Sequence, residues 1–127
     1  PHPTNENSIM ENSAKIAAVH RYVEAFDKAD MDIIRELYAA DAIVEDPVGT
    51  EPHVGIEAIC GFYEGALASG AKLVLTGSPR CAGNSVAFPF EAQMPGMRMQ
   101  IIDVFEFNDA GKISQMRAYW DNDNMIS

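Results

Sequence analysis

Residues 85–107 read SVAFPFEAQMPGMRMQIIDVFEF, and this stretch decides the fold. Apolar side chains recur at every second position on both sides of Pro95-Gly96. A period of two is typical of β-strands, and a proline–glycine pair is typical of a tight turn. The stretch therefore predicts two antiparallel strands, residues 85–94 and 97–107, joined as a hairpin.

Two more strands are expected around this hairpin, at residues 72–76 and 112–120. Clusters of turn-forming residues separate the strand segments from one another: Gly77-Ser78-Pro79, Ala82-Gly83-Asn84 and Asn108-Asp109-Ala110-Gly111. The second half of the chain therefore predicts an antiparallel meander.

The first half of the chain has a helical period instead. Apolar residues spaced three and four apart predict helices at residues 13–28, 31–40 and 55–69. Asp30 can cap the second of them. A short strand is expected at residues 42–46, because Pro47 and Gly49 follow it.

Helices followed by antiparallel strands predict an α+β fold, with three N-terminal helices packed in a strongly curved, mostly antiparallel sheet. Residues 13–127 are expected to form a single domain, preceded by a flexible tail at residues 1–12. Such a curved sheet, closed over helices, has an apolar interior that suits a hydrophobic ligand.

The overall charge excludes several classes of partner. The formal net charge is -10, with only 9 basic residues, which argues against binding nucleic acid or an anionic membrane surface. No long apolar run predicts a membrane span, and the polar start of the chain does not resemble a signal peptide. The two cysteines, Cys60 and Cys81, lie in no metal-binding pattern and predict free thiols in the cytoplasm.

Asp103 lies where an apolar residue is expected. On the strand at residues 97–107 it shares a face with Met99, Ile101 and Phe105. Burial there favours the neutral carboxylic acid, which can donate a hydrogen bond. The other interpretation is a structural Asp that bonds backbone donors or pairs with a buried Arg, and a bulge in the strand would turn the side chain outward.

Three tyrosines and a second aspartate are further candidates. Tyr22, Tyr38 and Tyr63 fall on the apolar stripes of the three predicted helices. Their hydroxyls need partners there, and they could bond one another or, alternatively, backbone carbonyls.

Asp46 precedes Pro47, which lacks a backbone donor. Asp46 is thus a candidate base, although Asp-Pro also commonly begins a turn, and the sequence does not decide whether Asp46 or Glu45 points inward.

Residues 38–49, YAADAIVEDPVG, resemble the signature stretch of the bacterial steroid Δ5-isomerases, also called ketosteroid isomerases. The resemblance extends from about Ala14 to about Asn124, through Arg21-Tyr22-Val23, Phe62-Tyr63, Phe88-Pro89-Phe90, Ile102-Asp103-Val104 and Ala118-Tyr119-Trp120. It implies the cone-shaped nuclear-transport-factor-2-like fold (a cystatin-like arrangement) and a homodimer.

The resemblance also implies roles for individual residues. Asp46 is similar to the family's general base, and Tyr22 and Asp103 resemble the two donors of its oxyanion hole. Tyr63 and Tyr38 resemble the hydrogen-bond relay behind the first tyrosine. Residues similar to those lining the steroid pocket are Phe90, Met116 and Trp120.

The implied reaction moves the double bond of a Δ5-3-ketosteroid into conjugation without any cofactor or metal. Phe88 and Met99 offer further apolar surface for such a ligand at alternating strand positions, unless they belong to the core. Two other functions remain open. The same fold serves cyclases and dehydratases that act on other hydrophobic carbonyl compounds, and a non-catalytic module would need the pocket but not the base.

Overall fold

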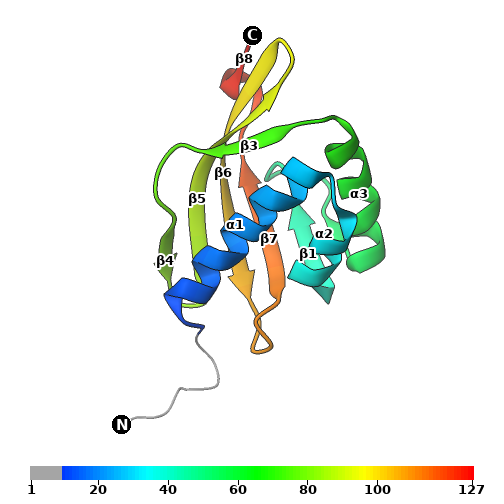
Figure 1. Cartoon of the computed structure of the whole chain (residues 1–127). Coiled ribbons are helices and arrows are strands. Elements are labelled where there is room, and N and C mark those ends of the chain that lie inside the picture. The colour runs from blue at the N-terminus through cyan, green and yellow to red at the C-terminus, as the bar shows by residue number, and fades with distance from the viewer. Residues whose placement is uncertain (1–9) are drawn as a thin grey trace.

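The computed structural model describes residues 10–127 as one curved sheet with helices on one of its faces (Figure 1). The helices are α1 (Asn12–Lys28), α2 (Met31–Leu37) and α3 (Ile56–Ala68), with a short 3₁₀ turn η1 (Asn122–Asn124) near the C-terminus. The strands are β1 (Tyr38–Glu45), β2 (His53–Val54), β3 (Lys72–Leu75), β4 (Arg80–Ala82), β5 (Ser85–Met94), β6 (Met97–Phe107), β7 (Ile113–Tyr119) and β8 (Met125–Ile126).

The predicted hairpin is confirmed and forms the centre of the sheet. Strands β5 and β6 pair antiparallel from Ser85 with Glu106 to Met94 with Met97. The main strand order is β2-β1-β7-β6-β5-β3, while β4 pairs with β5 and β8 pairs with β6. Within residues 10–127 every recorded pair is antiparallel except β1 with β7, so the sheet is mostly antiparallel, as expected.

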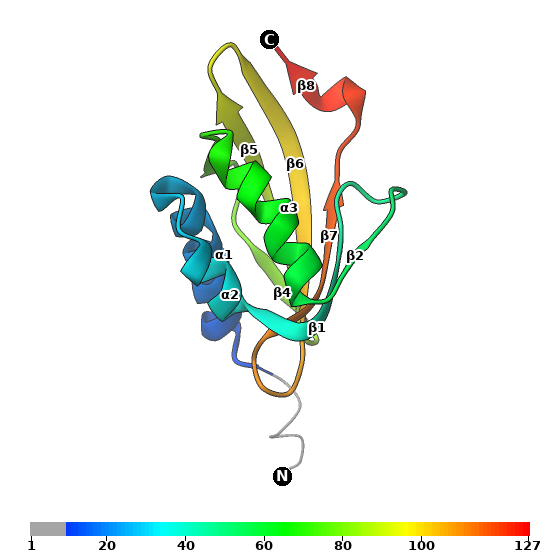
Figure 2. The same cartoon turned by 90° about the vertical axis from the view of Figure 1, so that its right-hand side faces the viewer.

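The helices pack on the concave side of the sheet. Figure 2 shows all three on the same side, with the sheet curving past them. Helix α1 buries Val19, Tyr22 and Phe26 against this side, and each such side chain stabilises the fold by roughly 1.5–3 kcal/mol. The Asp32 backbone N–H donates to the Asp30 side chain at 2.9 Å, which confirms the expected cap of α2. The predicted α+β class with three helices in a curved sheet is therefore confirmed.

The second helix is shorter than predicted. It ends at Leu37, and the chain enters β1 at Tyr38 rather than continuing as helix to residue 40. The physical reason is long-range pairing, because Tyr38 lies opposite Ile113 of the parallel strand β7. Tyr38 is thus a strand residue, and the prediction that it lies on a helix is wrong.

The short strands β2, β4 and β8 were not predicted, because two or three residues carry no clear period. The predicted tail, residues 1–12, lies outside the described residues up to residue 9, and α1 begins at Asn12. The bounds of the tail and of the domain stay predictions. Of the helices in residues 10–127, none is both long and apolar enough to span a membrane.

Candidate active site

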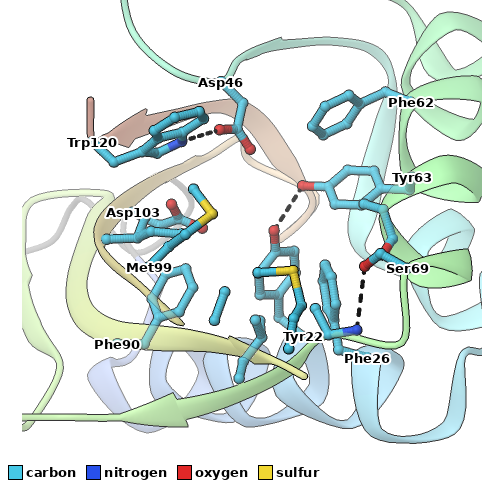
Figure 3. Close-up of a pocket in the computed structure, with 16 residues that line it drawn as sticks. Tyr22, Phe26, Asp46, Phe62, Tyr63, Ser69, Phe90, Met99, Asp103 and Trp120 are labelled. Carbon is cyan, nitrogen blue, oxygen red and sulfur yellow. Dashed lines mark hydrogen bonds between the residues drawn. The ribbon is translucent and has the colours of Figure 1, made fainter. Parts of the chain in front are cut away.

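A cavity of about 680 Å³, measured out to its open mouth, lies between helices α1 and α3 and the concave side of the sheet. Figure 3 shows the side chains that surround it. Its wall is mostly apolar, and the polar side chains in it are Tyr22, Asp46, Tyr63, Ser69, Asp103 and Trp120. A largely apolar cavity with a few converging polar groups is the usual form of a small-molecule site.

Asp103 is a buried acid that faces this cavity. It lies on β6 with 1% of its surface exposed, on the same side as buried Phe105. Burial, with a smaller contribution from the charge of Asp46, raises the pKa of Asp103 well above its usual value. Its Oδ1 atom has no hydrogen-bond partner among the described residues. An unpaired buried polar atom is costly to stability, and the Asp103 carboxyl group that carries it lines the cavity.

The three tyrosines form a hydrogen-bonded chain. The hydroxyls of Tyr22 and Tyr63 are 3.0 Å apart, and those of Tyr63 and Tyr38 are 2.6 Å apart. Tyr22 and Tyr63 line the cavity, whereas Tyr38 lies behind Tyr63. Burial raises the pKa of all three phenols well above the usual value, so they remain protonated donors. If Tyr38 donates to Tyr63 and Tyr63 donates to Tyr22, the Tyr22 hydroxyl is left to donate into the cavity.

Asp46 follows the end of β1 and faces the cavity from the other side. The Trp120 indole Nε1 donates a hydrogen bond of 2.8 Å to its Oδ1 atom (Figure 3). Partial burial raises the pKa of Asp46, while the Trp120 bond and the nearby His53 act to lower it. Because these opposing influences are absent at Asp103, Asp46 is the acid that more readily carries the negative charge.

Glu45 points away from the cavity. Its carboxylate accepts from the Gly49 backbone N–H at 3.2 Å and lies 3.7 Å from the Arg117 guanidinium. The sequence left open which of Glu45 and Asp46 faces inward, and in the structure it is Asp46.

The predicted pocket residues divide into two groups. Phe90, Met99 and Trp120 line the cavity, as expected. Phe88 and Met116 do not, because both are fully buried in the core beneath it. The Phe88 ring packs against the rings of Tyr22 and Phe105, at centroid distances of 6.2 and 4.9 Å.

Several lining residues were missed by the sequence interpretation. They lie on α1, α3 and the adjoining strands: Phe26, Ala66, Ser69, Ala71, Leu73, Ala92, Met94 and Ile101. Most are small or ordinary core-type residues. Only Ile101 was signalled, because it shares the inward face of β6 with Asp103.

The arrangement brings a neutral acid, a neutral phenol and an ionisable carboxylate to one apolar cavity. Donors held in place in such a site stabilise a negative charge that develops on a bound oxygen. A carboxylate beside them can remove and return a proton. The site is therefore suited to proton transfer at a carbon next to a carbonyl group.

Comparison with known proteins identifies a protein family and individual enzymes that are similar to this chain. The family model described as a SnoaL-like domain matches residues 19–116. A steroid Delta-isomerase from Nocardioides simplex is 37% identical over 114 residues, covering 87% of this chain and 92% of that protein. Epoxide hydrolase LasB from Streptomyces lasalocidi is 32% identical over 109 residues, covering 78% of this chain but only 38% of LasB.

A solved structure shares the fold closely. It is that of the epoxide hydrolase/cyclase-like enzyme SalBIII, which has a role in pyran ring formation in the polyether salinomycin. It superposes with a TM-score of 0.84 at 25% sequence identity, covering 91% of this chain and 96% of that chain.

Proposed function

The chain belongs to the SnoaL-like, or nuclear-transport-factor-2-like, family, and on that premise we propose that it is a steroid Δ5-isomerase. The family membership confirms the resemblance seen in the sequence. Its relatives include enzymes of two kinds, an isomerase and epoxide hydrolases or cyclases. One observation carries the choice of isomerase: buried Asp103, whose Oδ1 has no partner within residues 10–127, lines the same cavity as Tyr22 and Asp46.

The proposed reaction begins with the steroid carbonyl oxygen between Tyr22 and Asp103. Asp46 removes a proton from the carbon between the carbonyl and the double bond. The electrons of that C–H bond form a new carbon–carbon double bond, and the carbonyl oxygen becomes the negatively charged oxygen of a dienolate. Asp46, now protonated, returns the proton to the far end of the original double bond, and the carbonyl re-forms as part of a conjugated enone. No atom is gained or lost overall.

The main difficulty of this step is that the carbon next to the carbonyl is a weak acid. The donors Tyr22 and Asp103 lower the free energy of the anion that its deprotonation forms. Two preorganised hydrogen bonds at the oxygen stabilise the dienolate, and removal of one such donor typically costs roughly 10²- to 10³-fold in rate. Asp103 has to be neutral while Asp46 is ionised. Burial raises the pKa of both acids, but the Trp120 bond and His53 counteract it only at Asp46, which supports this division. Ketosteroid isomerase itself is the known example of an enzyme in which a protonated Asp and a Tyr donate hydrogen bonds to the same oxygen.

A homodimer is also proposed, and an apolar area on the outer side of the sheet supports it. Ile102 and Tyr119 are 48% and 47% exposed and lie opposite each other on β6 and β7. Pro89 of β5 pairs with Ile102 on its other side. We expect sedimentation to give a dimer mass, and Ile102→Glu to give monomers. A monomer in the unaltered protein would contradict the dimer without affecting the proposed reaction.

The proposal also includes a cytoplasmic location and a reaction without cofactor or metal. The two free thiols, Cys60 and Cys81, support a reducing compartment. The mostly apolar cavity wall supports an uncharged hydrophobic substrate.

The direct test mixes the protein with a Δ5-3-ketosteroid and follows the ultraviolet absorbance of the conjugated product. Asp46→Asn keeps the side-chain volume but loses the base, so we expect it to fold, to bind the steroid and to lose roughly 10²- to 10⁴-fold in rate. Glu45→Gln is the matched control, since Glu45 points away from the cavity. Turnover near normal in Asp46→Asn would reject Asp46 as the base. Steroid binding without turnover in the unaltered protein would favour a non-catalytic module.

A second candidate function is epoxide opening, which the similarity to LasB and SalBIII supports. Asp46 would accept a proton from the attacking hydroxyl or water as its oxygen forms a new C–O bond. The epoxide C–O bond at the same carbon would break, and Asp103 would donate its proton to the leaving epoxide oxygen. Proton exchange with solvent would then restore both acids. Incubation with a hydrophobic epoxide, followed by mass spectrometry, separates the candidates. Formation of a diol or cyclic ether, with no isomerisation of the Δ5-ketosteroid, would favour this second function.

A further inference from the structure

Ser69 is the polar residue of the cavity that the proposed reaction does not use. It follows the end of α3, where its neighbours in the cavity wall are the small residues Ala66 and Ala71. Ser69 lies six positions after Tyr63 along mostly helical chain, a length of roughly 9 Å at the usual helical rise. In Figure 3, Ser69 lies across the cavity from Asp103 and Trp120. A ligand whose carbonyl reached Tyr22 and Asp103, and which spanned the cavity from that side, would bring its far end to Ser69.

The hydrogen bonds that Ser69 makes within residues 10–127 leave one acceptor position of its hydroxyl oxygen unoccupied. Its hydroxyl donates to the Ala66 carbonyl at 2.6 Å. The same oxygen accepts from the Ala71 backbone N–H at 3.2 Å. A serine hydroxyl has one proton to donate and two lone pairs to accept with. Among residues 10–127 no further partner of this oxygen is recorded, so one acceptor position remains and no donor does.

The side chains that β3 and β5 contribute to the cavity wall are apolar. They are Leu73, Phe90, Ala92 and Met94. A polar group at the far end of a ligand would meet the Ser69 oxygen and little else that can form a hydrogen bond.

We propose that Ser69 is a specificity-determining residue that accepts a hydrogen bond from a hydroxyl group on the ring of the steroid farthest from the reacting carbonyl. This inference deepens the proposed isomerase function and rests on it. It assigns a substrate class: Δ5-3-ketosteroids whose far ring carries a hydroxyl rather than a ketone.

The preference follows from the direction of the hydrogen bonds. A far-ring hydroxyl can donate to the remaining lone pair of Ser69 without disturbing its two existing bonds. A far-ring ketone can only accept, so the Ser69 hydroxyl would first have to release the Ala66 carbonyl. Because Ser69 is exposed, water competes for the same position and the preference is moderate. We expect roughly a three- to tenfold higher kcat/KM for the hydroxyl substrate, the usual range for one net hydrogen bond.

The experiment measures kcat/KM for two Δ5-3-ketosteroids that differ only in a hydroxyl or a ketone on the far ring. In Ser69→Ala the ratio of the two values is expected to fall close to one. Ser69→Thr retains the hydroxyl and is expected to retain the preference. The matched control is Ser114→Ala, since the Ser114 hydroxyl donates to the Glu106 carbonyl at 3.1 Å and does not line the cavity; its ratio is expected to equal that of the unaltered protein.

Two results would overturn the inference. One is a ratio of one or less in the unaltered protein, which needs no variant to fold. The other is a preference that persists in Ser69→Ala, because it would then arise elsewhere in the cavity.

A binding measurement separates this inference from the proposed reaction. Saturated 3-ketosteroids with a far-ring hydroxyl or ketone cannot isomerise, and Trp120 in the cavity wall reports their binding through its fluorescence. Tighter binding of the hydroxyl compound, lost in Ser69→Ala, would support the role of Ser69 even if no Δ5-ketosteroid were turned over. Equal affinities for the two compounds would reject it even if turnover were fast.

Discussion

The indole N–H of Trp120 donates a hydrogen bond of 2.8 Å to Oδ1 of Asp46. The two residues are 74 positions apart in the sequence, yet each follows the end of a strand, and those strands, β7 and β1, pair in parallel with Arg117 opposite Glu45. The bond occupies one carboxylate oxygen, and no hydrogen bond to Oδ2 is recorded within residues 10–127. It thereby fixes the orientation of the proposed base and favours its charged form against partial burial.

Trp120→Phe tests this relationship. Loss of the N–H removes an influence that lowers the pKa of Asp46, so the pKa rises and the ionised fraction of the base falls in acid. We expect the acid limb of the kcat/KM profile to move to higher pH and the plateau rate to fall roughly three- to thirtyfold through lost orientation. Tyr119→Phe, on the outer side of the sheet, is the control. An acid limb that stayed in place would mean that the bond does not act on the base.

Asp103 is expected to make the folded protein less stable as the pH rises. Its pKa in the folded state lies well above the usual 3.8, so unfolding above about pH 4 releases a proton. The contribution of protonated Asp103 to the unfolding free energy is complete below the pKa of Asp103 in the unfolded state. It is lost as the pH rises through the pKa of Asp103 in the folded state. Asp103→Asn stays neutral and removes this dependence. Urea unfolding of both proteins from about pH 4 to pH 8 measures the difference.

The unfolding free energy of the unaltered protein, minus that of Asp103→Asn, is expected to decrease steadily as the pH rises. The ion-paired carboxylates Glu24, Glu36 and Glu91 have lowered pKa values and act in the opposite sense, but they are present in both proteins and cancel. A difference that grew with pH would show that Asp103 is ionised in the folded protein, and the proposed donor would be lost with it.

Tyr63→Phe tests the phenol chain. Tyr63 is the middle member, bonded to Tyr22 at 3.0 Å and to Tyr38 at 2.6 Å, so its loss leaves two buried hydroxyls without this partner. We expect a loss of about 1–3 kcal/mol in unfolding free energy, the cost of unpaired buried hydroxyls. The rate should fall by roughly three- to thirtyfold, because the Tyr22 donor is less polarised.

Tyr38→Phe is the graded comparison for the same chain. It removes only the outermost bond, and Tyr22 keeps its partner, so its effect on rate should be smaller than that of Tyr63→Phe. The reverse order would indicate that Tyr38, rather than Tyr22, is the end of the chain that matters to the ligand.

The parts of the fold with a strong local period were predictable. The alternation around Pro95-Gly96 gave both hairpin strands with their observed bounds, and the same alternation placed Asp103 on the inward side. Tyr38 shows where local period fails, since its spacing continues the preceding helical stripe while its pairing with Ile113 makes it strand. That pairing joins distant parts of the chain, and nothing in the neighbouring residues signals it.

The depth of a side chain inside the curved sheet was likewise not predictable. Phe88 and Phe90 share one face of β5, and their rings stack at a centroid distance of 5.5 Å. Only Phe90 lines the cavity, because Phe88 lies beneath Tyr22 in the core. A period of two gives the face of a strand, but the position along the strand at which the cavity begins depends on the helices that close it.

His53 is expected to act on the charge of Asp46 from outside the cavity. Its ring stacks on Phe62, a cavity-lining residue, at a centroid distance of 4.5 Å, and a protonated His53 lowers the pKa of Asp46. His53→Gln removes that charge, so the pKa of Asp46 rises and the acid limb of kcat/KM moves to higher pH. His20→Gln on the exposed side of α1 is the control. An acid limb that moved to lower pH in His53→Gln, or an equal shift in His20→Gln, would contradict a specific effect of His53 on the base.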